Sequence, residues 1–228
     1  MKLIPVIDLK GAVVVTAQLG KRADYAASDS PLCRSGEPRS VLSALLGLYP
    51  FDTLYIADID AISGDGSNLE LIRSLHLDHP GIKLWVDNGL TDLDRLCEFA
   101  RPVIGSESLT PHRITRLLDT LPSPVLSLDF HGQSFIGPAG LNLQPEHWTD
   151  EVIVMSLSRV GSTLGPDFNL LRRLSKKSPA RSFFAAGGVR DRSDLERLQS
   201  CGAAGALLST ALHQGRIGST ALRHFSGS

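Results

Sequence analysis

The sequence has almost no net charge, no long apolar run and no metal-binding pattern of cysteine or histidine. Its formal net charge is −1 over 228 residues, which leaves no basic excess for binding nucleic acid. No apolar run approaches the ~20 residues that cross a bilayer. Residues 1–6 (MKLIPV) lead straight into a predicted strand rather than a signal peptide. We therefore expect a cytoplasmic protein without a membrane or nucleic-acid partner.

Cysteine and histidine are sparse and scattered. Cys33, Cys97 and Cys201 are odd in number and far apart, so we interpret them as free thiols of a reducing compartment. The seven histidines show no paired spacing, and we expect neither a metal site nor a cofactor. His131 alone follows a candidate active-site acid, as either an ordinary loop histidine or a catalytic one.

A repeat is the main feature that the sequence does contain. Residues 4–11 (IPVIDLKG) and 125–132 (VLSLDFHG) each end an apolar run with an aspartate, Asp8 or Asp129, and place a glycine three residues later. Asp129 follows Asp8 by 121 residues, about half the chain. Three more pairs of segments recur in the same order: 55–75 with 152–174, 84–96 with 183–198, and 102–109 with 205–212. The chain therefore divides into two similar halves of four units each, about 1–121 and 122–228.

The eight units predict the fold. Each has an apolar run of four to six residues and then a helix-like amphipathic segment, which is typical of βα units around a parallel sheet buried on both faces. A closed βα barrel has about 250 residues, so residues 1–228 fit one α/β domain, a (β/α)8 TIM barrel. An open doubly wound sheet is the alternative, but a twofold repeat of four units closes more naturally into a barrel.

The two repeated aspartates are the candidate catalytic residues. In a βα barrel the site forms at the carboxyl ends of the strands, where Asp8 and Asp129 fall. Two carboxylates from opposite strands suit paired general acid and base catalysis. A strand-end aspartate can instead cap the following loop or helix, but two in equivalent positions favour catalysis.

A phosphate site is predicted after the last three strands. Glycines let backbone amides approach an anion, and the N-terminus of a short helix after the eighth strand completes a phosphate cradle. Residues 161–166 (GSTLGP) lie beside it and could supply donors or a lid. The candidate phosphate-binding residues are Gly161, Gly165, Gly187, Gly188, Ser209 and Thr210.

Other polar residues near strand ends are candidates for substrate contacts. They are Lys10, Asp58, Asp87, Ser106 and Ser156. Around the first loop there is also a basic cluster, which would either close over a substrate or form a solvated surface; it comprises Lys21, Arg22, Arg34 and Arg39.

These motifs together resemble the histidine-biosynthesis barrel family. The family comprises ProFAR isomerase (phosphoribosylformimino aminoimidazole carboxamide ribotide isomerase) and the cyclase subunit of imidazole glycerol phosphate synthase. The resemblance is carried by residues 4–11, 161–166, 186–189 (AGGV) and 209–212 (STAL) followed by Gly215. It implies an Amadori rearrangement of an aminoaldose to an aminoketose, with Asp8 as the base and Asp129 as the acid.

The sequence also departs from the isomerase pattern. The resemblance implies a second phosphate site at a glycine-rich turn after strand three, where residues 87–89 (DNG) keep one glycine and add a carboxylate. The threonine–aspartate pair after strand six becomes Met155-Ser156, and Val160 replaces an acid. The substrate-contacting tryptophan has no counterpart in residues 136–140, because Trp148 is expected in the next helix.

Such departures resemble a divergent branch of the family whose genes lie beside those for tetrahydromethanopterin, a one-carbon cofactor. Residues 55–62 (YIADIDAI) and the first loop with Leu32 and Cys33 are similar to that branch. A ribose or ribitol phosphate joined to an arylamine would need only one phosphate anchor.

Four functions are compatible with the sequence. They are an isomerase of a monophosphorylated aminosugar in cofactor biosynthesis, ProFAR isomerase itself, a non-catalytic binding or scaffold barrel, and a Schiff-base aldolase that uses Lys10. A phosphorylated sugar is the expected small-molecule partner, and a homo-oligomer is compatible with the sequence.

Overall fold

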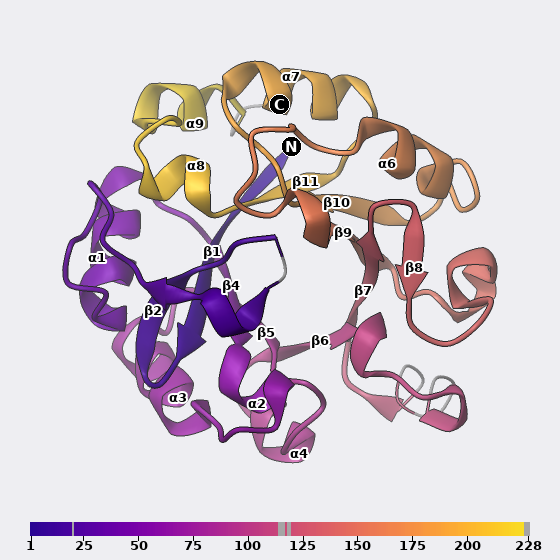
Figure 1. Cartoon of the computed structure of the whole chain (residues 1–228), viewed down its shortest axis with the longest axis horizontal. Coiled ribbons are helices and arrows are strands. Elements are labelled where there is room, and N and C mark those ends of the chain that lie inside the picture. Colours follow the sequence, from indigo (N-terminus) through magenta and orange to yellow (C-terminus); the bar gives the residue numbers. More distant parts are fainter. Residues whose placement is uncertain (20, 114–116, 118–119, 226–228) are drawn as a thin grey trace.

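Eight parallel strands close into a barrel in the computed structural model of the chain, which describes residues 1–19, 21–113, 117 and 120–225. Pairing of the first and last strands, with Lys2 opposite Gly205, completes the circle (Figure 1). In order around the barrel the strands are β1 (Lys2–Lys10), β4 (Thr53–Asp58), β5 (Lys83–Asp87), β6 (Arg101–Gly105), β7 (Val125–His131), β9 (Glu151–Ser156), β10 (Ser182–Ala186) and β11 (Gly205–Leu208). The predicted (β/α)8 fold is therefore confirmed.

Alternation along the strands divides the apolar residues into two layers. Successive side chains of a strand point to opposite faces, so β1 places Ile4 and Val6 inside the barrel and Ile7 and Leu9 outside, against the helices. The inner layer also contains Tyr55, Trp85, Val103, Val125, Ile153, Phe184 and Leu207. Polar residues with the parity of the inner layer consequently face the barrel interior where the strands end.

Helices cover the outside of the barrel and begin at recognisable caps. The side chain of Glu37 accepts hydrogen bonds from the amides of Arg39 and Ser40 at the start of α1, and Asp167 and Asp191 cap α6 and α7 in the same way. The helices are α1 (Pro38–Leu48), α2 (Ile59–Ser63), α3 (Leu69–Asp78), α4 (Leu93–Leu96), α6 (Phe168–Ser175), α7 (Arg192–Ser200), α8 (Thr210–His213) and α9 (Ser219–Phe225). None of the described helices is long and apolar enough to cross a membrane.

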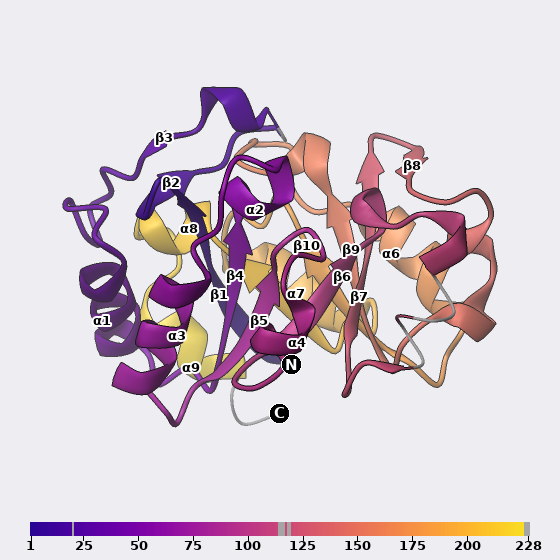
Figure 2. The same ribbon diagram turned by 90° about the horizontal axis from the view of Figure 1, so that it is seen from below.

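Two equivalent hairpins follow the first and fifth barrel strands. Strand β2 (Val13–Thr16) pairs antiparallel with β1, so that Asp8 lies opposite Val15, and β8 (Ser134–Ile136) pairs with β7, so that Asp129 lies opposite Ile136. A short strand β3 (Ala26–Ala27) extends the first hairpin. Both hairpins extend from the end of the barrel at which α2 lies, and the N-terminus lies at the opposite end (Figure 2). The structure thus reproduces the repeat around the two aspartates.

The expectation of an α-helix after every strand is wrong for the fifth unit. Residues 132–150, all of which are described, contain only β8 and the 3₁₀ helices Leu141–Leu143 and Pro145–His147. Proline at positions 138 and 145 interrupts any longer helix there. Trp148 follows the second 3₁₀ helix, where it is buried and its indole N–H donates to the carbonyl of Leu141. This tryptophan therefore belongs to the core.

Candidate active site

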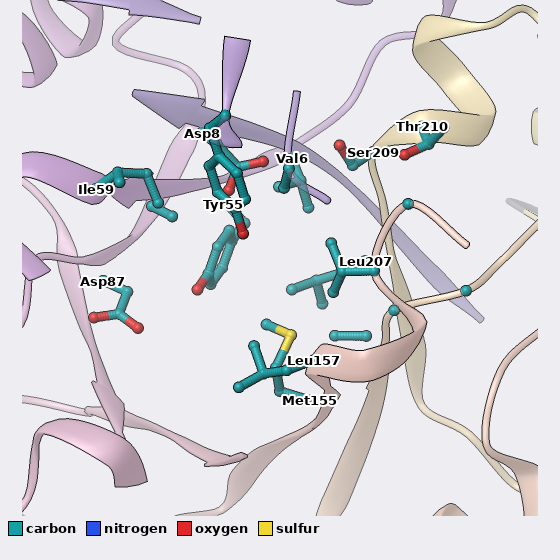
Figure 3. Close-up of a pocket in the computed structure, with 18 of the residues that line it drawn as sticks. Val6, Asp8, Tyr55, Ile59, Asp87, Met155, Leu157, Leu207, Ser209 and Thr210 are labelled. Carbon is teal, nitrogen blue, oxygen red and sulfur yellow. The ribbon is translucent and has the colours of Figure 1, made fainter. Parts of the chain in front are cut away.

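A cavity whose empty space, together with the open solvent at its mouth, is about 930 Å³ lies at the carboxyl ends of the barrel strands. It brings together most of the predicted site residues. Those that line it are Asp8, Asp87, Asp129, Gly161, Gly187, Gly188, Ser209 and Thr210. Asp87 lies on one side of this cavity and Ser209 with Thr210 on the other (Figure 3).

Asp8 continues the inward-facing row of Ile4 and Val6 on β1. Its side chain is only 8% exposed, and no hydrogen bond to its carboxylate is found in the described part of the chain. Burial raises the pKa of this carboxyl from 3.8 to about 7, and the nearby Arg22 partly offsets that effect. Asp8 is therefore a carboxyl that can hold or release a proton near neutral pH.

Asp129 lies on β7, across the barrel from Asp8, and is held by its neighbours. Ser127 Oγ donates to its Oδ1 at 2.6 Å, and the amide of Glu107 donates to its Oδ2 at 3.1 Å. Ser106 Oγ also lies 3.1 Å from Oδ2. Burial raises the pKa of Asp129 to about 7, although the hydrogen bonds from Ser127 and Ser106 oppose the rise. The two repeated aspartates therefore share a similar proton affinity but differ in how firmly they are held.

Asp87 ends β5 and is a third buried carboxyl. A Cβ placed on Gly105 would lie 3.1 Å from Asp87 Oδ2 and 3.5 Å from Asp129 Oδ2, so the two carboxyl groups flank a common point. Burial, and then the charge of Asp129, raise the pKa of Asp87 to about 7. The amide of Gly89 donates to Asp87 Oδ1 at 3.2 Å. The turn after β5 thus uses its glycine amide to hold its own carboxyl.

An ion pair joins two loops at the cavity. Arg22, in the 3₁₀ helix Arg22–Asp24, pairs with Glu107, in the 3₁₀ helix Ser106–Ser108 after β6, and both side chains line the cavity. Lys10 Nζ donates to the carbonyl of Arg22 at 2.9 Å and so holds the first loop in place. Of the predicted basic cluster, only Arg22 lines the cavity; Lys21, Arg34 and Arg39 do not.

Two tyrosines of the cavity were not predicted. Tyr55 has the parity of the inner layer of β4 and is 3% exposed, and its hydroxyl has no hydrogen-bond partner among the described residues. Burial, together with the charges of Asp87 and Asp129, raises the pKa of Tyr55 well above its usual value. Tyr25, from the first loop, has its pKa raised to about 12 by burial and by Asp8. The alternation of β4 would have identified Tyr55, whereas no sequence signal marked Tyr25.

The opposite side of the cavity is built from glycine turns. Gly187 and Gly188 have φ of 94° and 86°, and a Cβ on them would lie 2.5 Å from the carbonyls of Ser156 and Gly165 respectively. Both positions therefore require glycine. Ser209 precedes helix α8, and Thr210 begins it. Arg216, which was not predicted, also lines the cavity.

Several candidate residues support the site without lining the cavity. Asp58 accepts hydrogen bonds from the amides of Ala61 and Asn68 and from Asn68 Nδ2, because it caps α2 and holds the following loop. Ser156 and Gly165 contribute the carbonyls beneath Gly187 and Gly188. The remaining residues outside the lining are Lys10, Ser106 and His131.

The fold and the cavity define a (β/α)8 barrel with paired carboxyl groups at the carboxyl ends of its strands. Residues 2–218 match the family described as histidine biosynthesis protein, and the chain belongs to that family. The resemblance seen in the motifs is therefore confirmed.

The relatives extend over nearly the whole chain. An uncharacterised protein of Methanocaldococcus jannaschii is 28% identical over 223 residues, which cover 94% of each chain. The 1-(5-phosphoribosyl)-5-((5-phosphoribosylamino)methylideneamino)imidazole-4-carboxamide isomerase of Myxococcus xanthus is 28% identical over 249 residues, with 100% of both chains covered. The isomerase of the same name from Cenarchaeum symbiosum is 27% identical, with 95% of this chain and 97% of the relative covered.

Proposed function

We propose that this protein is an aldose–ketose isomerase that acts on a phosphorylated aminosugar. The observation that carries the proposal is the pair of buried carboxyls, Asp8 and Asp129, which face one cavity from opposite strands with pKa values raised to about 7. At neutral pH such a pair can hold one proton between them, so that one carboxyl acts as an acid and the other as a base. The relatives named as isomerases support the reaction class.

The proposed reaction is an Amadori rearrangement. Asp129 gives a proton to the ring oxygen of an aminoaldose as the ring opens to a protonated imine, and Asp8 removes the proton from C2 to give an enolamine. Asp8 then returns a proton to C1, and the 2-hydroxyl of the enolamine loses its proton to Asp129, which yields the aminoketose and restores both carboxyls with no net gain or loss of atoms. The roles are assigned by the family resemblance.

The surroundings of Asp129 are compatible with its role as the acid. Ser106 Oγ lies 2.6 Å from the carbonyl of Ile136 and 3.1 Å from Asp129 Oδ2. Its single hydroxyl proton can serve only one of these acceptors at a time. If that proton goes to Ile136, a protonated Asp129 can donate to Ser106 Oγ, and the buried contact is satisfied.

The phosphate of the substrate is proposed to bind at the glycine turns, beside Ser209 and Thr210. Backbone amides of glycine turns and of a helix start are suitable donors to phosphate oxygens, and Arg216 adds a positive charge at the cavity. On the side of Asp87 the amide of Gly89 is already bonded to a carboxyl. A substrate with one phosphate therefore suits the cavity better than one with two.

A second candidate is the reaction of the named relatives. The name of these isomerases contains two phosphoribosyl groups. This candidate therefore requires that a second phosphate of the substrate be tolerated near Asp87. We also propose, on the resemblance of residues 55–62, that the enzyme acts in tetrahydromethanopterin biosynthesis. The similarity to the Methanocaldococcus jannaschii protein over 94% of both chains is compatible with that branch. A cytoplasmic location and a homo-oligomer remain part of the proposal.

Two substrates test the proposal. In one assay the purified protein is incubated with ProFAR, and the near-ultraviolet absorbance change reports turnover. In the other it is incubated with N-phenylribosylamine 5-phosphate deuterated at C2, and loss of deuterium to water reports turnover. We expect turnover of the monophosphate. Turnover of ProFAR alone would establish the relatives' reaction instead, and turnover of neither substrate by the folded protein would favour a binding barrel.

A carboxylate introduced at Thr210 tests the phosphate site. In Thr210→Asp the acid at the start of α8 is compatible with the helix but repels a phosphate beside it. We expect inorganic phosphate to bind at least about tenfold more weakly, measured by calorimetry. Thr210→Asn, similar in shape and uncharged, is the control and should retain binding. Equal affinity for phosphate in both variants would show that phosphate does not bind beside Thr210.

A further inference from the structure

The β5–β6 side of the cavity carries more carboxyl groups than cationic ones. Asp87 and Glu107 lie there, and Asp129 borders it, whereas Arg22 is the cation that faces them and is already paired with Glu107. Arg216, the other arginine of the lining, belongs to the loop that follows α8. The cavity is therefore polarised, with carboxyl groups on one side and glycine turns on the other.

Two polar groups near this side open into the cavity without a hydrogen bond to the described residues. They are the carboxylate of Asp8 and the hydroxyl of Tyr55, which belong to residues that are 8% and 3% exposed. Tyr55 lies between Asp8 and Asp87 (Figure 3). Because both groups face the cavity and not the packed core, a ligand that brings hydrogen-bond donors into the space between them can bond to both.

We propose that the β5–β6 side of the cavity is a subsite for a protonated amine or amidine of the substrate, with Asp87 as its charge partner. The proposal rests on the phosphorylated aminosugar function and specifies its nitrogen-bearing half. An ammonium or amidinium group presents only donors and a positive charge. It can bond to Asp87 Oδ2, and it matches the acceptors of Asp8 and Tyr55 as well.

Other occupants fit this side less well. A phosphate would meet Asp87 at a turn whose glycine amide is bonded to that same carboxyl. A metal ion needs several ligands that converge on one point, and no group of three or more histidine, cysteine, aspartate or glutamate side chains among the described residues could hold one. A neutral hydroxyl could donate one hydrogen bond but would leave an ionised Asp87 without a charge partner. A cation satisfies both requirements.

Three probes with the same five-carbon chain distinguish an amine, a hydroxyl and a phosphate as the occupant of this side. They are 5-aminopentyl phosphate, 5-hydroxypentyl phosphate and pentane-1,5-diyl bisphosphate, which share a phosphate and differ at the far end. We expect the amine to bind about 10- to 100-fold more tightly than the alcohol, because a charge-assisted hydrogen bond contributes about 1.5–3 kcal/mol. The bisphosphate should bind more weakly than the alcohol. Affinities are measured by calorimetry at pH 7.5 in low salt.

Asp87→Asn identifies the charge partner. Asparagine keeps the shape and still accepts from Gly89, so the fold should be retained, but the preference for the amine over the alcohol should fall to about threefold or less. Binding of inorganic phosphate should remain unchanged. The control is Asp65→Asn, which removes the same charge from an exposed residue outside the cavity and should keep the full preference.

The outcomes distinguish this subsite from the proposed function. Equal affinity for amine and alcohol, or tighter binding of the bisphosphate, would overturn the amine subsite while leaving phosphate binding and isomerisation intact. If inorganic phosphate fails to bind, the phosphate part of the proposed function falls. In that case 5-aminopentanol, which has no phosphate, tests the subsite. Binding by the wild type that is lost in Asp87→Asn would support the amine subsite. If the wild type does not bind 5-aminopentanol, the subsite is overturned.

Discussion

Asp8→Asn is expected to lower the turnover of the proposed isomerase by about three powers of ten, the scale of general acid–base catalysis. The carboxylate would act on the C2 proton, so its loss affects the transition state more than the bound substrate. Turnover should therefore fall while KM changes little. The fold should be retained, since the carboxylate makes no hydrogen bond among the described residues and its burial already favours a neutral group. Deuterium loss from C2 measures the effect.

The pH profile separates a catalytic role from a structural one. With two carboxyls of pKa about 7, the wild type should show a narrow bell-shaped profile whose limbs belong to the pair. Residual turnover of Asp8→Asn should lose the acidic limb, and that of Asp129→Asn the alkaline limb. Asp65→Asn is the matched control and should follow the wild type. If Asp8→Asn keeps more than a tenth of the turnover, Asp8 is not the base.

The residues that line the cavity could largely be predicted from strand alternation. Asp8 follows Val6, and Asp87 follows Trp85, each two positions beyond an inner-layer residue, so both side chains face the interior. Asp58 lies one position after Ala57 and for that reason faces away, towards the loop that it caps. Position at a strand end was therefore an insufficient criterion, and parity would have removed Asp58 from the candidates.

The parts of the site that come from loops could not be predicted. Arg22 and Glu107 are 85 residues apart and meet only because the first and fourth loops cross the mouth of the same barrel. Gly165 was predicted to contact phosphate, but it does not line the cavity, and its carbonyl instead occupies the space that a side chain at position 188 would need. Sequence patterns report the period of strands and helices, but they do not report the distance between loops.

The absence of a helix in the fifth unit has a similar cause. The repeat predicted a helix between β7 and β9 by analogy with the first half, where α1 follows β2. Prolines at positions 138 and 145 were visible in the sequence, and they should have outweighed the repeat. The two halves are therefore equivalent at the barrel strands and hairpins that carry the aspartates, whereas the helix of the first unit has no counterpart in the fifth.

The stability of Asp87→Asn relative to that of the wild type is expected to increase as the pH rises from 4 to 8. Burial raises the pKa of Asp87 from 3.8 to about 7, so between these values the folded protein keeps a proton that the unfolded chain has released. The stability that this carboxyl contributes is complete below pH 3.8 and is lost as the pH rises through about 7. Asparagine does not ionise. The free energy of unfolding of the variant minus that of the wild type should therefore grow by up to roughly 4 kcal/mol.

Urea unfolding at several pH values measures this difference. Comparing variant with wild type removes the contributions of all other titrating groups, and Asp65→Asn should show no trend, since its carboxyl is exposed. Saturating 5-aminopentyl phosphate should stabilise the wild type more than the variant at pH 8, because a bound cation favours the ionised form of Asp87. A difference that stays constant from pH 4 to 8 would mean that Asp87 is ionised throughout, as in water. The expectation that burial raises the pKa of Asp87 would then be wrong, whereas the charge that the amine subsite requires would be present at every pH tested.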